Sequence, residues 1–369
     1  MVLALSLFLV APMIESQVHI EQHPGEVSHD SVPFTWPTAT AAEAGLDPAK
    51  LEAAVELAAA GASDSLLVIH DGRLVVERYW NGKTAQDVQQ TYSGTKSLYA
   101  LLIGRAIERG YISGLDQPLR ELIAEMPEAQ AQVTFRSVLG MVSGMENSLQ
   151  IESLGGSGRT QLEIALEREI TAAPFEKYHY NNGAYRLTFT ALERASGRSL
   201  ETLTAEEVLG PLGIDGAFWM RIYALDENGR ERFTGYQSIR MTPRDYAKSA
   251  QVILDGGMWN GERFLPQVFT DEVVQSPAPE VNPSFGLFFH LNAGDFHRDY
   301  GVPDRLERKL IPGAPDDTFL MYGAGGQLVA GIPSLRLVIV RTGGDSGSSL
   351  YEADNLFARL IRGIAEAAR

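Results

Sequence analysis

The sequence predicts an α+β fold, in which an antiparallel sheet is flanked by N- and C-terminal helices and carries an inserted, mainly helical domain. Three observations predict it. Strand patterns occur near both ends of the chain, helix patterns fill most of the middle, and a strong hairpin signal opens the first strand region. Such a chain most simply builds one sheet domain from its two ends.

The first elements follow a linker rich in Thr, Ala and Pro. Residues 47–61 predict a helix, with Asp47 as its cap and Pro48 at its first position. The next segment, SLLVIHDGRLVVERYW, predicts a β-hairpin, because two β-branched runs flank Asp71-Gly72.

The middle of the chain shows mainly helical patterns. A helix is predicted to start at Thr95 and to end at Gly110, with its leucines on buried faces. Further helices are predicted over residues 161–170, 185–196, 199–210 and 242–257.

Strand patterns return toward the C-terminus. FGLFFHLN, QLVAGIPS and LRLVIVRT are short, β-branched or aromatic, and separated by turn residues. The last segment, 349–369, has apolar residues at helical spacing and predicts a terminal helix.

These elements predict a domain organisation. The assigned parts are an N-terminal apolar segment and linker (1–44), a sheet domain (45–90 and 258–369) and a mainly helical domain (91–257). We expect an active site at the interface between the last two.

The N-terminal run MVLALSLFLVAPMIES has the length of a signal-peptide apolar region and is too short to span a bilayer. No Lys or Arg precedes Lys50, and no A-x-A-like site follows the run. Export to the periplasm or medium is slightly favoured over a cytoplasmic location. The segment with His19, His23 and His29 is interpreted as an uncommitted tail rather than a metal site.

Composition excludes several classes of function. The chain has no cysteine, which excludes disulfides, thiolate metal ligands and a Cys nucleophile. Its formal net charge of -16 argues against nucleic acid and anionic membranes as partners. No H-E-x-x-H or phosphate-binding G-x-x-x-x-G-K-[ST] occurs, and His290 and His297 are interpreted as a loop pair. We therefore expect no metal and no cofactor.

The stretch TYSGTKSLYALL combines a nucleophile and a base. Ser93 stands at the predicted helix start and Lys96 follows three residues later, so that the two share one helix face. A Ser hydroxyl needs such a positioned proton acceptor to act as a nucleophile. The same pair is also compatible with an ordinary helix cap followed by a good helix former.

Two further motifs follow in the chain. Tyr180 and Asn182 form a Tyr-x-Asn motif in FEKYHYNNGAYRL, and the glycines of MYGAGGQLVAGI stand directly before a predicted strand. Glycine permits close approach of backbone to a ligand. A packed aromatic loop and a glycine-rich turn are the alternative interpretations.

Taken in this order, the three motifs resemble those of the serine β-lactamase and penicillin-binding-protein superfamily. The similarity is closest to the class C-like branch, which includes esterases and 6-aminohexanoate-dimer hydrolases. It extends from about residue 45 to the C-terminus and includes the phrases GYISGLDQPL, FRSVLGMVSGM, LGPLGI and MTPRD. The resemblance implies a β-lactamase/DD-peptidase-like fold.

The resemblance also implies roles for individual residues. Ser93 would form an acyl-enzyme, with Lys96 and Tyr180 as general base and acid. Asn182 would orient the acyl side chain or the lysine. The N–H groups of Ser93 and Gln327 would hold the oxyanion, next to Gly325 and Gly326.

One departure from the family pattern bears on the substrate. The third motif of β-lactamases and DD-peptidases begins with a cation that helps to bind a substrate carboxylate, whereas this chain has Ala324-Gly325-Gly326. Losing such a charge-assisted bond costs roughly 1.5–3 kcal/mol. Arg341, on the next strand, is a candidate to compensate.

These features predict a serine hydrolase that acts on a small-molecule ester or amide, with no nucleic-acid partner and no membrane span. They leave the oligomeric state open. A DD-peptidase or weak β-lactamase of the same fold is one alternative. A non-catalytic acyl-ligand sensor or scaffold is another, and an α/β-hydrolase is disfavoured because no G-x-S-x-G occurs.

Several other residues are candidates for the substrate pocket. Tyr236 and Gln237 precede a family-like helix start and are interpreted equally as pocket or as surface loop. Trp219, Trp259 and the aromatic run FGLFF could form an apolar acyl pocket, with core packing favoured for each.

Overall fold

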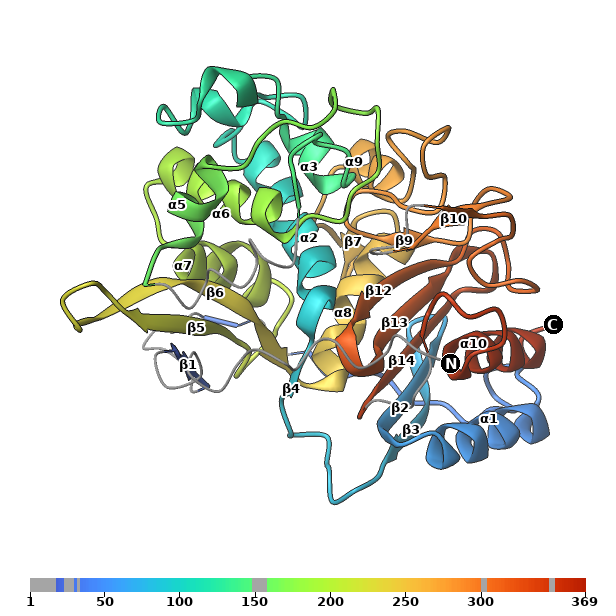
Figure 1. The fold of residues 1–369 in the computed structure, drawn as a ribbon. Helices are drawn as coiled ribbons and strands as arrows, with labels where there is room; N and C mark the ends of the chain where they lie inside the picture. Colours follow the sequence, from blue (N-terminus) through green and yellow to red (C-terminus); the bar gives the residue numbers. More distant parts are fainter. Residues whose placement is uncertain (1–17, 23–29, 32–33, 148–157, 300–303, 345–348) are drawn as a thin grey trace.

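A six-stranded antiparallel sheet, built from both ends of the chain, organises the molecule (Figure 1). The structure is a computed structural model that describes residues 18–22, 30–31, 34–147, 158–299, 304–344 and 349–369. The strand order is β3-β2-β14-β13-β12-β9. The strands are β2 (Ser63–His70), β3 (Arg73–Tyr79), β9 (His290–Leu291), β12 (Phe319–Gly323), β13 (Gln327–Ile332) and β14 (Leu337–Gly343). The predicted α+β class is confirmed.

The predicted hairpin at Asp71-Gly72 is present between β2 and β3. Asp71 and Gly72 have φ values of 47° and 70°. Two positive φ values are what a tight hairpin turn between right-twisted strands requires, and Asp-Gly supplies them at low cost.

Two helices from opposite ends of the chain cover one face of the sheet: α1 (Pro48–Ala60) and α10 (Leu356–Ala367), which lie side by side in Figure 1. Asp47 caps α1, since its Oδ1 accepts the N–H of Ala49 at 2.9 Å. The Asp47 N–H donates to the carbonyl of Ala367 at 2.9 Å and ties the two helices together. The predicted cap is therefore confirmed.

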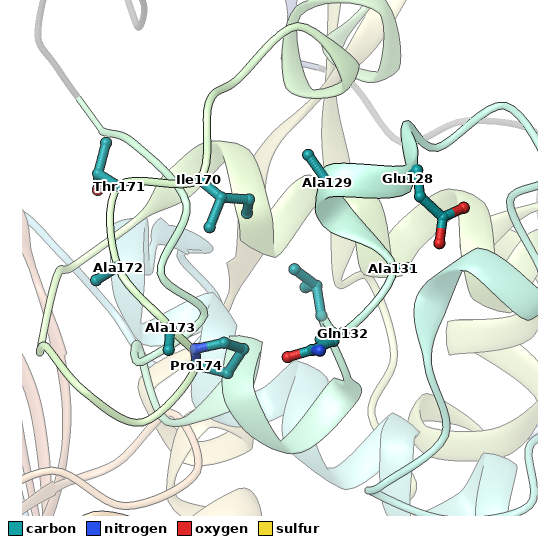
Figure 2. A pocket seen from close by; sticks show the side chains of 10 residues that line it. Glu128, Ala129, Ala131, Gln132, Ile170, Thr171, Ala172, Ala173 and Pro174 are labelled. Atoms are coloured by element: carbon teal, nitrogen blue, oxygen red, sulfur yellow. The ribbon is translucent and has the colours of Figure 1, made fainter.

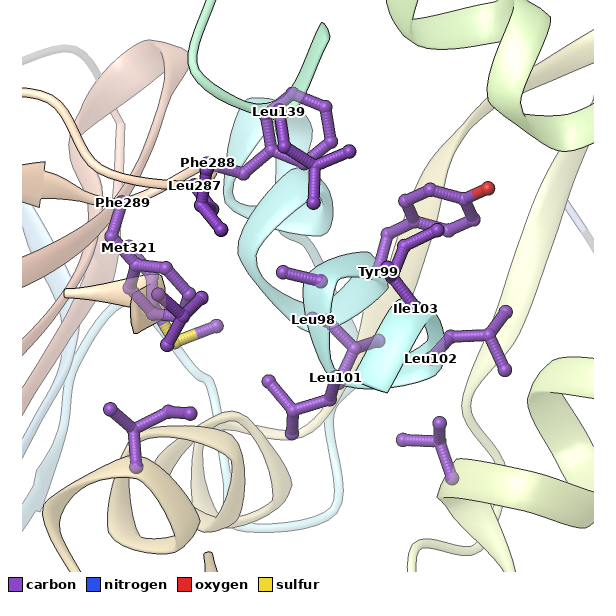
Figure 3. Close-up of a cluster of buried hydrophobic side chains, with 14 of the residues drawn as sticks. Leu98, Tyr99, Leu101, Leu102, Ile103, Leu139, Leu287, Phe288, Phe289 and Met321 are labelled. Atoms are coloured by element: carbon purple, nitrogen blue, oxygen red, sulfur yellow. The ribbon is translucent and has the colours of Figure 1, made fainter. Parts of the chain in front are cut away.

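The other face of the sheet packs on α2 (Thr95–Glu108) and α8 (Pro243–Leu254). Figure 3 shows Leu98 and Leu101 of α2 in one buried cluster with Phe289 and Met321 from the sheet side. The side chains of β14 alternate between the two cores: Val338 and Val340 belong to the α2 side, and Leu337 and Ile339 to the α1–α10 side. Fully burying one such side chain contributes about 1.5–3 kcal/mol.

The remaining helices lie on the side of the molecule away from α1 and α10 (Figure 1). They are α3 (Phe135–Leu139), α5 (Gln161–Leu166), α6 (Asn182–Ser196), α7 (Leu200–Thr204) with a π-helical continuation (Ala205–Leu209), and α9 (Gln267–Val273). Short 3₁₀ turns occur at Tyr92–Gly94 (η2), Leu119–Glu121, Glu128–Gln130, Ala324–Gly326 (η7) and Pro333–Leu335. The predicted helix at 161–170 is shorter than expected and ends at Leu166.

A second sheet contributes strands to the region 91–257, which the sequence predicts as mainly helical. Its order is β1-β5-β6-β4. Its strands are β1 (Val18–Glu21), β4 (Gln89–Gln90), β5 (Phe218–Leu225) and β6 (Glu231–Met241). The burial of β5 does not alternate along the strand, so its sequence lacks the period-2 signal of a half-buried strand.

The N-terminal segment is only partly a tail. His19 lies in β1, opposite Tyr223 of β5, so the interpretation of this stretch as uncommitted is wrong for residues 18–21. His23, His29 and the apolar residues 1–17, on which the signal-peptide interpretation rests, lie outside the described residues.

The strand predicted for FGLFFHLN is wrong except at β9. Phe288 has a φ of 66°, and a bridge joins Phe285 to His290, so the aromatic run turns back on itself. Its aromatic rings are buried in the core rather than arranged along a ladder. Strand β12 has no counterpart among the strands predicted from the sequence. Two small ribbons complete the strands: β7 (Met258–Trp259) with β8 (Glu262–Arg263), and β10 (His297–Arg298) with β11 (Arg305–Leu306).

Candidate active site

Ser93 lies in the turn η2, directly before α2 and between the sheet and the helical part of the molecule. The residue before it, Tyr92, has a φ of 47° and is 41% exposed. A positive φ at an aromatic residue is sterically unfavourable and persists only where surrounding contacts hold it. Ser93 is half-buried in the middle of this strained turn.

Two threonines fix the turn to β6. The Thr91 hydroxyl donates to the carbonyl of Ile239 at 2.9 Å, and the N–H of Ile239 donates to the Thr95 hydroxyl at 3.0 Å. The two hydroxyls also lie 2.8 Å apart. The start of α2 is therefore anchored by a closed set of buried hydrogen bonds, which the sequence alone did not indicate.

Gly94 allows the turn to pack against α8. A Cβ at this position would lie 1.6 Å from the phenol oxygen of Tyr246. The backbone of Gly94 is αR, so this contact alone requires glycine.

We expect Gly94→Ala to lower kcat by about 100-fold, because a shift of about 1 Å in a reacting group costs this much. Tyr246→Phe in the same chain should restore part of the loss, since it removes the nearest atom. Gly363→Ala is the matched control, because a Cβ there would meet nothing within 4 Å. Ester hydrolysis by the three variants checks this, and an unchanged kcat in Gly94→Ala would contradict it.

Lys96 lies one helical turn after Ser93 and is 5% exposed. Its Nζ donates to the Ser93 Oγ at 3.3 Å. The same nitrogen lies over two aromatic rings, 5.0 Å from the centre of Tyr180 and 4.8 Å from that of Tyr185. The structure thus brings together Ser93, Lys96 and Tyr180, which the sequence analysis had selected.

The Tyr-x-Asn segment is held by its middle residue. Asn181 caps α6 by accepting the N–H of Ala184 at 2.9 Å, and its amide donates to the carbonyls of Met145 and Glu146. Asn182 is the first residue of α6 and is half-buried. The cap at Asn181, which was not predicted from the sequence, therefore fixes the position of Tyr180 directly before the start of α6.

The glycine-rich loop packs directly on the turn of Ser93. It comprises Ala324, Gly325 and Gly326 between β12 and β13, and both glycines have positive φ values, 71° and 82°. At the end of β12, a Cβ on Gly323 would lie 2.1 Å from the carbonyl oxygen of Thr91. Close packing of β12 against η2 therefore requires glycine at 323, and brings the loop next to Ser93.

Two predicted residues have their side chains turned to structural contacts. The Gln327 side chain donates to the carbonyl of Gly343 at 2.6 Å and accepts the Gly343 N–H at 3.3 Å. Arg341 is fully buried, and its guanidinium binds the carbonyls of Gly325 and Gly326 at 3.2 and 2.9 Å. Arg341 therefore cannot supply the exposed cation that the glycine-rich motif lacks.

His290 belongs to the surroundings of Lys96 and was not selected as a site residue. It is 7% exposed, and its ring contacts Phe285 and Tyr322, with ring centres 5.0 and 6.0 Å away. Burial, the charge of Lys96 and that of His297 together lower the pKa of His290 from 6.5 to about 3. His290 is thus neutral at physiological pH.

This lowered pKa predicts a pH dependence of stability. Between pH 6.5 and about 3 the unfolded chain binds a proton that the folded chain does not, so the free energy of unfolding falls as the pH falls. From pH 7 to pH 5 the expected loss is about 2 kcal/mol. Urea unfolding of wild type and His290→Gln at both pH values checks this. Equal pH dependence in the two proteins would contradict it.

The residues considered for an aromatic acyl pocket are mostly core. Trp219 and Tyr236 are buried with ring centres 5.4 Å apart, and Trp259 packs against Trp36. Gln237 is exposed and accepts a hydrogen bond from Gln90 at 3.3 Å. The contacts of these four residues give no support for a role in the pocket.

One hollow in the described surface borders none of the predicted site residues. It has a volume of about 510 Å³ and lies between residues 128–133 and 170–174 (Figure 2). Glu128 is the only titratable side chain that lines it. The lining contains no serine, lysine or histidine, so it has no counterpart of the Ser93–Lys96 pair.

The described residues contain no group of three or more His, Asp or Glu side chains that could hold a metal ion. Nor is any helix in the described ranges long and apolar enough to cross a membrane.

The six-stranded sheet with helices on both faces, and a Ser–Lys pair at the start of the central helix, define the serine β-lactamase fold. The chain belongs to the β-lactamase family, whose model matches residues 50–361. Among curated proteins, none matches the sequence.

Solved structures of this fold resemble the chain at low sequence identity. A putative 6-aminohexanoate-dimer hydrolase from Bacillus anthracis has 19% identity and a TM-score of 0.66, over 96% of this chain and 91% of that one. EstCE1, a hydrolase with promiscuous acyltransferase activity, has 14% identity and a TM-score of 0.64, over 85% and 98%. Simvastatin synthase from Aspergillus terreus has 16% identity and a TM-score of 0.59, over 86% and 96%. Family and fold together indicate a hydrolase acting on small molecules.

Proposed function

We propose that this protein is a serine hydrolase that cleaves an ester or amide bond through an acyl-enzyme on Ser93. The observation that carries the proposal is the contact of 3.3 Å between the Lys96 Nζ and the Ser93 Oγ, in a position where Lys96 is 5% exposed. A nucleophile and a base within reach of each other are the essential parts of covalent acyl transfer.

In this proposal Lys96 takes up the Ser93 proton as the hydroxyl attacks the acyl carbon. Burial disfavours a charged amine, which supports such a role for a lysine so little exposed. Tyr180, whose ring lies against the Lys96 Nζ, is the partner that returns a proton to the leaving group. Tyr180 regains its proton from the protonated Lys96. Water then attacks the acyl carbon and gives a proton to Lys96, which passes it to the Ser93 Oγ as the acyl bond breaks and the acid leaves.

The N–H groups of Ser93 and Gln327 are the proposed oxyanion donors. Gly325 supports this assignment, because its positive φ value and missing side chain leave the backbone of the loop open to a substrate. Asn182, at the first position of α6, is proposed to orient the acyl group.

The proposed substrate has a neutral acyl group rather than a carboxylate next to the scissile bond. Ala324 stands where relatives carry a cation, and the guanidinium of Arg341 is fully buried behind the loop. This combination counts against a DD-peptidase or a β-lactamase with anionic substrates. A non-catalytic sensor is disfavoured because Ser93, Lys96 and Tyr180 are all retained and lie together.

The test is a pre-steady-state measurement with a short-chain p-nitrophenyl ester, followed by mass spectrometry of the enzyme trapped with an alkyl fluorophosphonate. The expected result is a burst equal to the enzyme concentration, steady turnover, and a phosphonyl group on the peptide with Ser93. A burst without turnover would instead support the sensor. A label on another residue would reject Ser93 as the nucleophile.

A further inference from the structure

We propose that Arg341 is a positioning residue for the oxyanion site: it holds the Gly325–Gly326 turn from behind, so that the N–H of Gln327 faces Ser93. This inference rests on the proposed function and adds a residue that takes no part in the chemistry itself. It replaces the expectation that Arg341 compensates for the missing cation by touching the substrate.

The hydrogen bonds of Arg341 join the glycine turn to two neighbouring segments of the chain. The side chain is 0% exposed. Its Nη1 binds the carbonyls of the glycine turn, and its other nitrogens bind the chain between α1 and β2 and the end of β14. These further partners are the Ser63 hydroxyl at 3.0 Å and the carbonyls of Gly61, Ala62 and Gly344 at 3.0, 2.9 and 3.1 Å.

Arg341 lies on the face of the sheet opposite to Ser93. Side chains alternate along β14, and Ile339, two residues earlier, packs in the core formed with α1 and α10. The guanidinium lies 5.7 Å from the ring centre of Phe357, which belongs to α10. Ser93 precedes α2, which covers the other face.

The geometry of one peptide unit carries the inference from Arg341 to the oxyanion site. The carbonyl of Gly326 and the N–H of Gln327 belong to the same planar peptide, and no peptide bond in the described residues is cis. The carbonyl and the N–H of a trans peptide point in opposite directions. Because Arg341 binds this carbonyl at 2.9 Å, the N–H of Gln327 points away from the guanidinium.

The positive charge strengthens the same donor. A charge-assisted hydrogen bond to a carbonyl polarises the peptide, and bonds in such a chain strengthen one another in a low-dielectric interior. A fixed dipole of this kind stabilises a developing oxyanion without any reorganisation during the reaction. The positive charge of Arg341 therefore acts by polarising the Gly326–Gln327 peptide, without contact with the substrate.

The surrounding glycines fit this role. A Cβ on Gly326 would lie 2.6 Å from the Arg341 Nη1, and a Cβ on Gly343 would lie 2.8 Å from its Nη2. Both positions therefore leave the space that the guanidinium occupies. The planar fork also explains why arginine is required, since a lysine ammonium cannot bind several carbonyls in fixed directions.

The test compares Arg341→Lys with wild type, with kcat expressed per active site titrated by the p-nitrophenol burst. We expect kcat to fall about 10- to 100-fold and KM to change less than about threefold, because a misdirected donor weakens mainly transition-state binding. Inhibition by phenylboronic acid, whose tetrahedral adduct places an oxygen in the oxyanion position, should weaken by a similar factor. Arg105→Lys is the control, since Arg105 is also a buried arginine and binds the carbonyl of Phe264.

A purely structural role would lower the melting temperature of Arg341→Lys and leave kcat per titrated site and boronate affinity unchanged, which would overturn the inference. If Arg341→Lys does not fold, Ser63→Ala is the second variant, because it removes the hydroxyl that binds the Arg341 side chain. We expect a several-fold fall in kcat at constant KM. An unchanged kcat in Ser63→Ala would overturn the inference. Absence of a burst in wild type would contradict the proposed function itself. A burst in both proteins with equal kcat per titrated site would contradict only the proposed role of Arg341.

Discussion

Ser93→Ala should abolish the burst of p-nitrophenol and lower kcat by at least about 10⁴-fold, since loss of a nucleophile that acts as a unit with its base removes nearly all covalent catalysis. The substitution removes one half-buried oxygen in η2 and leaves the anchoring threonines in place. The melting temperature is therefore expected to change little. Burst kinetics, steady-state kinetics and a thermal melt of the same preparation check the three parts of this prediction.

Ser97→Ala is the matched control for this experiment. Ser97 lies in α2, directly after the turn of Ser93, is 1% exposed, and donates to the carbonyl of Phe288 at 2.5 Å. Its loss should cost about 1–3 kcal/mol of stability, because a buried carbonyl loses its partner, and should leave the burst intact. A burst that survives in Ser93→Ala would show that the nucleophile lies elsewhere.

Lys96→Met should lower the rate of acylation by about 10³-fold, in the range expected for loss of a general base that acts directly on the nucleophile. Methionine retains much of the length and the apolar stem of the side chain, so the packing against Tyr180 and Tyr185 is largely kept. Stopped-flow measurement of the burst rate, rather than its amplitude, reports the acylation step.

Lys96→Arg separates proton transfer from a purely electrostatic role. Arginine retains the positive charge near Ser93 but does not give up its proton in proteins. We expect Lys96→Arg to be as slow in acylation as Lys96→Met. Substantial activity in Lys96→Arg would mean that Lys96 acts as a fixed charge, and would move the role of base to Tyr180.

Both predictions concern residues that were found from the sequence, and the reason is their spacing. Ser93 and Lys96 are three residues apart at a helix start, so local geometry alone places them on one face. The Asp47 cap and the Asp71-Gly72 hairpin were predicted correctly for the same reason, since each depends on neighbouring residues. The resemblance of the three ordered motifs added the fold class, which the family match and the structural relatives confirm.

The errors have a common physical origin. The segments β5 and FGLFFHLN both pack against side chains from distant parts of the chain. In β5 this packing hides the alternation expected of a strand, and in FGLFFHLN it requires a run of apolar residues that resembles a strand. Strand or turn is decided there by packing rather than by local propensity.

By itself, the sequence determined the α+β class, the local placement of Ser93 next to Lys96, and the absence of cysteine chemistry. Only the tertiary structure decided that Arg341 faces away from Ser93, that His290 lies near Lys96, and that Gly94 must leave room for Tyr246. Each of these relations joins residues far apart in the chain. They depend on which buried surfaces meet when the two cores form, and local periodicity carries no information about that choice.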